Sequence, residues 1–178
     1  NEKVIPYWTE MAAFAKAHGI EKIAFEMHPA FVVYNPETLL RLRAAVGDII
    51  GANFDPSHLY WQGIDPCAAI KALKGAIYHF HAKDTLIDKR NTEVNGVLDT
   101  KPYNLIDERA WVFRTVGYGH DKFEWNRIIS TLRTVGYDGV VSIEHEDGLM
   151  SQKEGLEKAV SFLKEVLITE DPGNQYWI

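Results

Sequence analysis

The stretch Tyr78-His79-Phe80-His81-Ala82-Lys83-Asp84 closes a short apolar segment with histidine, lysine and aspartate. Buried strands rarely carry several ionisable side chains at one end unless those side chains belong to a site. Three other apolar segments end in a similar way, on the carboxylates Glu26, Asp55 and Glu144. The four segments predict parallel strands whose carboxyl ends meet at one site.

Helical patterns separate these strand-like segments. Apolar residues recur at three- and four-residue spacing, and the pairs Asn35-Pro36 and Asp65-Pro66 are typical of a helix start. We expect strands at residues 22–27, 49–54, 76–81 and 139–143, and helices at residues 4–18, 36–46, 66–73, 123–135 and 152–167.

This order of elements predicts an α/β fold of the (β/α)8 TIM-barrel type, with consecutive strands parallel. A full barrel typically needs about 250 residues, whereas the chain has 178 residues and only about four βα units. We therefore expect a half barrel over residues 1–167, with a long loop at 85–117 and a tail at 168–178. Because half a barrel exposes two strand edges, we expect a missing N-terminal half, or a second copy in a homo-oligomer, to complete it.

The composition is that of a globular domain, with 46% hydrophobic and 25% charged residues. A net charge of −6 at pH 7 gives no basic surface for nucleic acid or for an anionic membrane. No apolar run reaches the roughly 18 residues of a membrane span. The single cysteine, Cys67, excludes an internal disulfide and suits a reducing compartment. We therefore expect a cytoplasmic protein with neither a nucleic-acid partner nor a membrane partner.

The four strand-end residues Glu26, Asp55, His81 and Glu144 predict a metal site. Three carboxylates held close together repel each other unless a cation lies between them. Oxygen ligands with one imidazole suit Mn²⁺, Mg²⁺ or Co²⁺, and Zn²⁺ also accepts this set. The alternative is that the four are unrelated polar residues that face water at the ends of their strands.

Several motifs closely resemble the C-terminal half of the xylose-isomerase-like TIM barrels, a superfamily of sugar isomerases, sugar and sugar-phosphate 3-epimerases, dehydratases and endonuclease IV. The motifs are Glu26-Met27-His28-Pro29, Asp55-Pro56-Ser57-His58, residues 79–84, Gly117-Tyr118-Gly119, and residues 136–139 leading to 143–147. The resemblance implies that the four segments are barrel strands 5–8. It also implies Glu26, Asp55, His81 and Glu144 as metal ligands, and His58 as a contact to a substrate oxygen.

The same resemblance implies a metal-dependent sugar or sugar-phosphate isomerase or epimerase, with Mn²⁺ as the favoured ion and a small carbohydrate as substrate. Glu26 and Glu144 are then the acid/base pair on opposite faces of a ketose. The metal holds a carbonyl and a neighbouring hydroxyl and stabilises an enediolate. One glutamate removes a proton and its partner returns one.

Other residues near the strand ends have two interpretations each. Lys83 either polarises the substrate or forms a surface salt bridge, and Trp61 either stacks on a sugar or covers the barrel rim. Arg114, together with His120, is placed to reach an anionic substrate or to flank the long loop. For three further residues we do not expect a functional role. We favour a core position for His79, and solvated charge for Glu146 and Asp147.

Three other functions compete with the isomerase. An endonuclease of the endonuclease IV type is disfavoured, because the residues around Asn95-Gly96 lack the Asp-x-His pair that its zinc cluster requires and because the chain is acidic. A metal-dependent lyase or dehydratase uses the same site and remains open. The third alternative is a half barrel that binds metal or sugar without turnover.

Overall fold

The computed structural model describes residues 1–98 and 100–174. Residues 175–178 of the predicted tail lie outside this part. The strands are β1 (Ile23–Glu26), β2 (Ile50–Phe54), β3 (Ile77–Ala82), β4 (Asp84–Ile87), β5 (Trp111–Arg114) and β6 (Val141–Ile143). The helices are α1 (Val4–Ala17), α2 (Pro36–Val46), α3 (Ser57–Tyr60), α4 (Pro66–Ala72), α5 (Lys89–Asn95), the 3-10 turn Ile106–Glu108, α6 (Lys122–Thr134) and α7 (Gln152–Val166).

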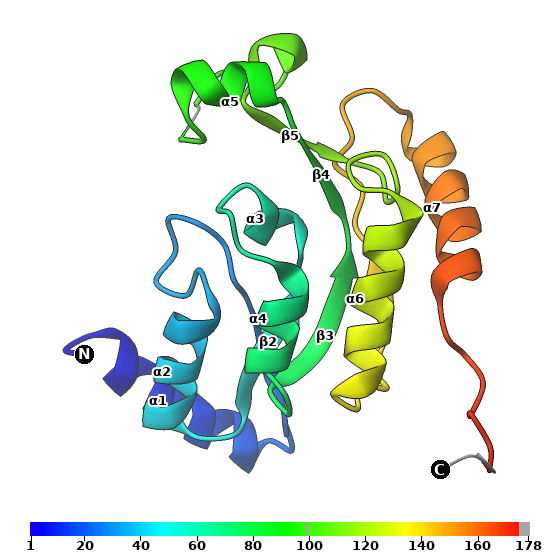
Figure 1. Ribbon diagram of the computed structural model, residues 1–178. Helices are drawn as coiled ribbons and strands as arrows, with labels where there is room; N and C mark the ends of the chain where they lie inside the picture. Colours follow the sequence, from blue (N-terminus) through cyan, green and yellow to red (C-terminus); the bar gives the residue numbers. More distant parts are fainter. Residues whose placement is uncertain (99, 175–178) are drawn as a thin grey trace.

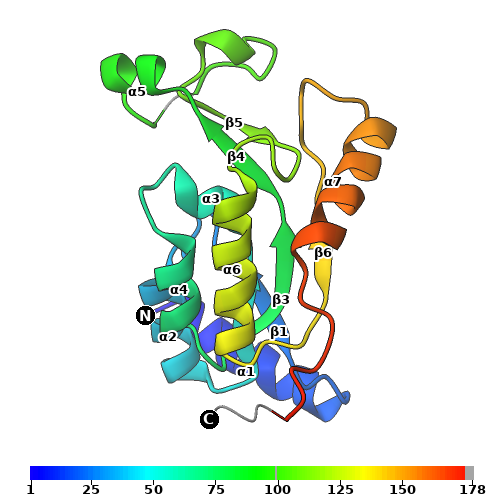
Figure 2. The ribbon, with the colours of Figure 1, turned by 45° about the vertical axis from the view of Figure 1, so that its right-hand side comes forward.

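Four of the strands form one parallel sheet in the order β1-β2-β3-β6. Helices α2, α4 and α6 lie on one face of this sheet (Figures 1 and 2). The sheet and its helices are therefore half of a (β/α)8 barrel, as the sequence predicts. Within the described residues, β1 and β6 each pair with a single neighbour, so each leaves an open edge.

Side-chain caps define where the helices begin. Asn35 accepts the amide of Thr38 and completes a capping box at α2, and Asp65 accepts the amide of Ala68 at α4. Asp121 and Ser151 cap α6 and α7 in the same way. Each cap satisfies an amide that would otherwise have no partner within the helix, an effect worth about 1 kcal/mol.

The segment predicted as a long loop contains regular structure. Strands β4 and β5 form an antiparallel ribbon, in which Asp84 pairs with Arg114 and Ile87 with Trp111. The ribbon continues directly from β3 and, with α5, extends beyond the carboxyl ends of the parallel strands (Figure 1). Its inner side is buried, because Trp111 stacks on Trp61 with ring centroids 4.5 Å apart. The ribbon was not predicted because its four-residue strands are too short for a clear periodic pattern.

The core lies between the parallel sheet and its helices. Phe54 and Phe80 are fully buried on adjacent strands, with parallel rings 5.6 Å apart, and Trp125 of α6 is also fully buried. These side chains fix the strands that carry the candidate site. Among the described residues, no helix has both the length and the apolar character that a membrane crossing requires.

Candidate metal centre

The four strand-end residues lie together at the carboxyl edge of the parallel sheet. Glu26 is the last residue of β1, His81 is the penultimate residue of β3, and Asp55 and Glu144 follow β2 and β6 directly. Each offers one potential ligand atom, and the four atoms lie within 4.8 Å of one another. Parallel pairing across β1, β2, β3 and β6 is what brings these ends to one place.

His81 lies at the centre of the group. Its Nδ1 atom is 2.8 Å from Glu144 Oε2, 3.3 Å from Glu26 Oε1 and 4.0 Å from Asp55 Oδ2. Ligand atoms about 2.1 Å from one ion are separated by about 3.0 Å when they are neighbours in an octahedron. The spacing around His81 is therefore of the size that a shared divalent ion requires.

The hydrogen bonding of these atoms supports the same interpretation. Glu26 Oε1, Asp55 Oδ2, His81 Nδ1 and Glu144 Oε2 are each buried and have no hydrogen-bond partner in the described structure. A buried polar atom without a partner costs roughly 1–3 kcal/mol, and more when it is charged. Four such atoms that face one another fit a divalent cation, so the residues present suit the predicted metal. Their role as metal ligands stays a prediction.

Asn53 is a residue that the sequence analysis missed. Its amide lies 3.1 Å from Nε2 of His81, on the side of the ring opposite the carboxylates, and its Oδ1 atom has no partner. The oxygen and nitrogen of an amide are assigned from their surroundings. With Oδ1 turned toward the ring, the Nε2–H group donates to Asn53 and Nδ1 presents its lone pair to a metal. Period-two alternation along β2 was the available signal, because it places Asn53 and Asp55 on one face.

Replacing Asn53 with leucine is therefore expected to weaken divalent-metal binding by about 10–100-fold, the usual cost of removing a partner of a ligating histidine. The affinity for Mn²⁺ can be measured by isothermal titration calorimetry. Asn126→Leu on α6 is the matched control, because Asn126 lies on the exposed side of the helix. Unchanged affinity in Asn53→Leu would show that Asn53 does not orient the ring.

Lys83 is buried in the same group, with 1% of its surface exposed. Its Nζ atom is 2.8 Å from Glu146 Oε2, 3.2 Å from Glu144 Oε2 and 3.3 Å from Asp55 Oδ2. Burial acts to lower the pKa of Lys83, but these carboxylates outweigh it and raise the pKa above the ordinary value. The lysine is therefore a permanent internal cation, and the surface salt bridge considered for it is excluded by its burial.

His58, the predicted substrate contact, lies behind the carboxylates. Its Nε2 atom is 3.5 Å from Asp55 Oδ2 and 3.8 Å from Glu26 Oε1. Burial, reinforced by the charge of Lys83, lowers the pKa of His58 to about 3, so the ring is neutral at pH 7. Burial also raises the pKa of Asp55 to about 6, against the opposing influence of Lys83. The close contact with His81 lowers the pKa of Glu26, which favours its ionised form.

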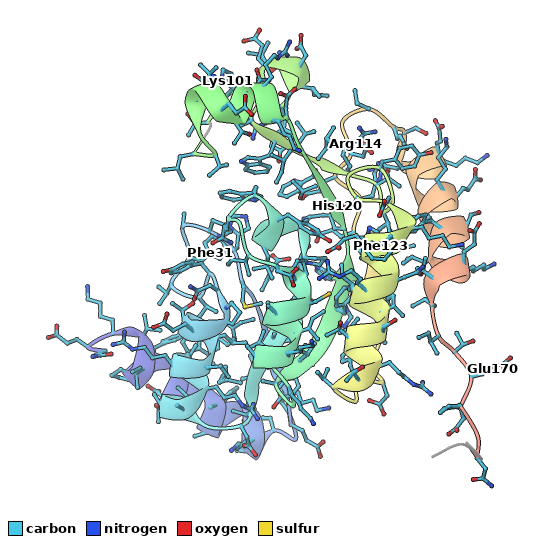
Figure 3. The ribbon with its side chains drawn as sticks, viewed as in Figure 1. Phe31, Lys101, Arg114, His120, Phe123 and Glu170 are labelled. Atoms are coloured by element: carbon cyan, nitrogen blue, oxygen red, sulfur yellow. The ribbon has the colours of Figure 1, made fainter. Side chains whose placement is uncertain are left out.

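Trp61, Arg114 and His120 have protein partners. Trp61 stacks on Trp111 and is 9% exposed. Arg114 donates from Nε to Asp147 Oδ2 at 3.0 Å. His120, close to the start of α6 (Figure 3), has its Nδ1 atom 2.8 Å from Asp84 Oδ1 and stacks on Tyr60. The predicted substrate contacts of Trp61, Lys83 and Arg114 stay predictions. His79 is half-buried beside Ser142, with Nε2 2.7 Å from the hydroxyl.

Two aspartates bind backbone amides near the site. Asp147 was predicted to be solvated, which is wrong: its carboxylate is buried and accepts the amides of Thr115 and Leu149 at 2.8 Å. Asp84 is also fully buried and accepts six hydrogen bonds. Gly119 must be glycine here, because a Cβ atom would lie 2.4 Å from the carbonyl oxygen of Thr85. These contacts fasten the turn after β5 and the loop after β6 to the end of β3.

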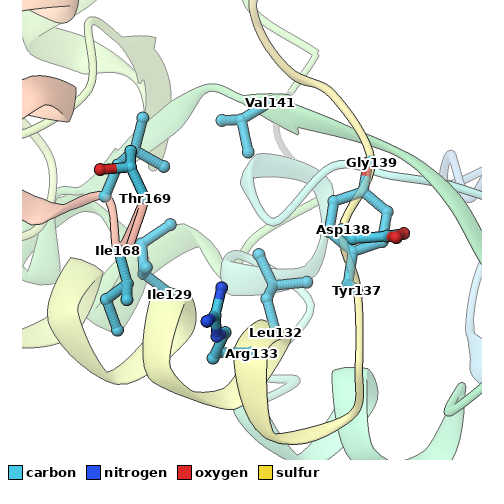
Figure 4. A pocket seen from close by; sticks show the side chains of 10 residues that line it. Ile129, Leu132, Arg133, Tyr137, Asp138, Gly139, Val141, Ile168 and Thr169 are labelled. Atoms are coloured by element: carbon cyan, nitrogen blue, oxygen red, sulfur yellow. The ribbon is translucent and has the colours of Figure 1, made fainter. Parts of the chain in front are cut away.

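A separate pocket lies at the opposite end of the sheet, next to the start of β6. It has a volume of about 440 Å³ and is lined by Ile129, Leu132 and Arg133 of α6 and by Tyr137, Asp138 and Thr169, among others (Figure 4). None of the four converging residues lines it. Because active sites of (β/α)8 barrels lie at the carboxyl ends of the strands, the candidate site is the convergent group and not this pocket.

Comparison with known proteins supports the fold. A sequence model of the family described as "Xylose isomerase-like TIM barrel" matches residues 1–166. The uncharacterized protein YfiH of Bacillus subtilis (strain 168) is 45% identical over 94% of this chain and 53% of its own length. An inosose dehydratase of Clostridium perfringens is 27% identical over 88% of this chain and 51% of its own length. The chain therefore spans about half the length of these curated relatives.

A solved structure agrees with the sequence comparisons. The IolI protein, solved with a zinc atom bound, superposes with a TM-score of 0.67 at 22% identity. The match covers 93% of this chain and 55% of the IolI chain. At this level of identity the likeness establishes the fold.

Proposed function

The chain belongs to the xylose isomerase-like TIM barrel family, and from that premise we propose that it forms the metal-binding half of an enzyme that removes a proton next to a carbonyl group of a sugar or polyol. The observation that carries the proposal is the set of four buried ligand atoms without hydrogen-bond partners, all within 4.8 Å of one another. The zinc in the IolI structure and the dehydratase among the relatives support it.

The proposed centre is held by Glu26, Asp55, His81 and Glu144. A divalent ion bound there supplies Lewis acidity, which lowers the pKa of the carbon acid beside the carbonyl. Glu26 and Glu144 come from β1 and β6, the two outer strands of the parallel sheet. A substrate that lies over the carboxyl edge is therefore flanked by one glutamate on each side, and either can accept a proton from carbon.

Two outcomes of this first step define two candidate functions. In an isomerase, a proton is returned to the neighbouring carbon of the enediolate. In an epimerase, the second glutamate returns a proton to the same carbon on its opposite face. In a dehydratase, a hydroxyl group leaves from the neighbouring carbon and takes up a proton as water. The 27% identity to an inosose dehydratase over 88% of the chain favours keeping the dehydratase as the second candidate. The other half of the barrel, or a second copy of the chain, completes the substrate pocket in both cases.

Deuterium exchange tests the shared step. The full-length polypeptide that carries this sequence is incubated in D₂O with Mn²⁺ and a panel of ketoses and inososes, and exchange at the carbon beside the carbonyl is followed by NMR. Glu144→Gln and Glu26→Gln are each expected to slow exchange by about 10²–10⁴-fold, the usual contribution of a general base. A product that has lost one water relative to the substrate identifies a dehydratase, and an isomeric sugar that carries the exchanged deuterium identifies an isomerase or epimerase.

Glu154→Gln is the matched control, because Glu154 lies on the exposed surface of α7, where its carboxylate forms an ion pair with Lys158. It should leave the exchange rate unchanged. Exchange by the wild type that survives in both Glu26→Gln and Glu144→Gln would exclude these residues as the bases. Absence of exchange, with metal bound, would favour a half barrel that binds without turnover.

A further inference from the structure

A buried lysine inside a proposed cation site is an unusual arrangement. The ammonium of Lys83 and the proposed metal face the same two oxygen atoms, Asp55 Oδ2 and Glu144 Oε2, which lie 3.3 and 3.2 Å from Nζ. The lysine side chain is 2% exposed, so neither water nor dissolved salt screens its charge effectively. Burial of a lysine requires compensation by paired carboxylates, and here the carboxylates are also the metal ligands.

Lys83 has two further contacts that fix its position. Its hydrogen bond goes to Glu146 Oε2 at 2.8 Å, and its ammonium lies 4.3 Å from the ring centre of Phe113 on β5. Glu146 belongs to the loop after β6, and its side chain is 49% exposed. Asp55 Oδ2 and Glu144 Oε2 receive no hydrogen bond from Lys83, although both are close to it. The lysine is therefore anchored by Glu146 and Phe113, while its charge still acts on the two ligands.

We propose that Lys83 and Glu146 form a charge pair that sets the metal affinity of the centre. In the metal-free protein, the ammonium counters the repulsion between Asp55 and Glu144 and keeps them close together. When a divalent ion binds, the same ammonium becomes a neighbouring positive charge and opposes binding. Glu146 balances Lys83 and limits that opposition. This inference rests on the proposed metal site and assigns Lys83 a positioning role instead of a substrate contact.

A purely structural role for the pair makes a different prediction. If Lys83 and Glu146 only tie the loop after β6 to the end of β3, removing either partner loosens the same loop and weakens metal binding in both variants. The electrostatic role predicts opposite signs. Removing the positive charge strengthens metal binding, and removing the negative charge weakens it, because a buried charge acts on a nearby ion through a low effective dielectric.

The experiment measures Mn²⁺ affinity by calorimetry for the wild type, Lys83→Met, Glu146→Gln and the double variant. Lys83→Met is expected to bind at least about tenfold more tightly, and Glu146→Gln about three- to tenfold more weakly. The Mn²⁺ affinity of the double variant should lie between those of the two single variants. Lys83→Met should also melt at a lower temperature without metal and show a larger rise in melting temperature with it. Lys122→Met, which removes an exposed ammonium paired with Glu165, is the control and should not change affinity.

The outcomes separate the two proposals. If the wild type binds no divalent metal, the proposed function fails. If the wild type binds metal but both variants weaken binding, or neither changes it, the charge-pair inference is overturned and the metal site stands. If Lys83→Met does not fold, Lys83→Gln takes its place, because its neutral amide can still donate to Glu146: tighter metal binding than the wild type supports the inference, and equal or weaker binding overturns it.

Discussion

Replacing Asp84 with asparagine is expected to lower the free energy of unfolding by about 3–5 kcal/mol, the cost of breaking a buried, fully hydrogen-bonded charged group. Oδ2 of Asp84 accepts the amides of Gly117, Gly119 and His120 and the indole N–H of Trp125, all between 2.9 and 3.1 Å. An asparagine side chain has only one acceptor oxygen. Whichever way its amide turns, its NH₂ group faces N–H donors, which leaves buried donors without partners.

Urea denaturation of the wild type and of Asp84→Asn measures this difference. Asp121→Asn is the matched control, because Asp121 caps α6 through the amide of Glu124 and is exposed, and asparagine caps helices as well as aspartate does. The control should lose less than about 0.5 kcal/mol. A loss in Asp84→Asn no larger than that of the control would mean that the turn after β5 is not held by this carboxylate.

The second large effect is stabilisation by metal. An ion that binds only the folded protein stabilises it by about 2.7 kcal/mol when its concentration is 100 times the dissociation constant. Adding Mn²⁺ to metal-free protein is therefore expected to raise the melting temperature, and a chelator should reverse the rise. The doubly substituted variant Glu26→Gln/Glu144→Gln should show no rise, because it loses two of the three carboxylates that attract the ion.

A variant with the same two substitutions at exposed positions, Glu154→Gln/Glu157→Gln on α7, controls for the change in net charge. It should keep the full metal-induced rise. A rise of equal size in the Glu26→Gln/Glu144→Gln variant would place the metal elsewhere on the protein. The melting curves also report the stability of the metal-free state, which the charge of Lys83 is proposed to support.

The sequence predicted the parallel sheet and the four converging residues for the same physical reason. Strands of alternating α/β order are parallel, and the carboxyl ends of parallel strands meet at one edge. Glu26, Asp55, His81 and Glu144 each stand at such an end, so local patterns were sufficient to place them together. The caps at Asn35 and Asp65 were predictable because they depend only on neighbouring residues.

The surroundings of the site could not be predicted in this way. The buried state of Lys83 depends on Phe113, which is 30 positions further along the chain on a strand of only four residues. The carboxylate of Asp147 is buried because the amide of Thr115, 32 residues earlier, donates to it. In the sequence, Lys83 and Asp147 look like ordinary charged residues beside a strand. Contacts between distant segments decide their burial, and no local period records such contacts.

We propose that one divalent ion binds Glu26, Asp55, His81 and Glu144 together, and the metal content of the dialysed protein measures this binding. The protein is stripped with chelator, equilibrated with Mn²⁺ or Zn²⁺, dialysed and analysed by atomic spectroscopy. We expect one equivalent of metal per chain in the wild type and none in Glu26→Gln/Glu144→Gln. Metal-free wild type, or equal metal content in the two proteins, would contradict it.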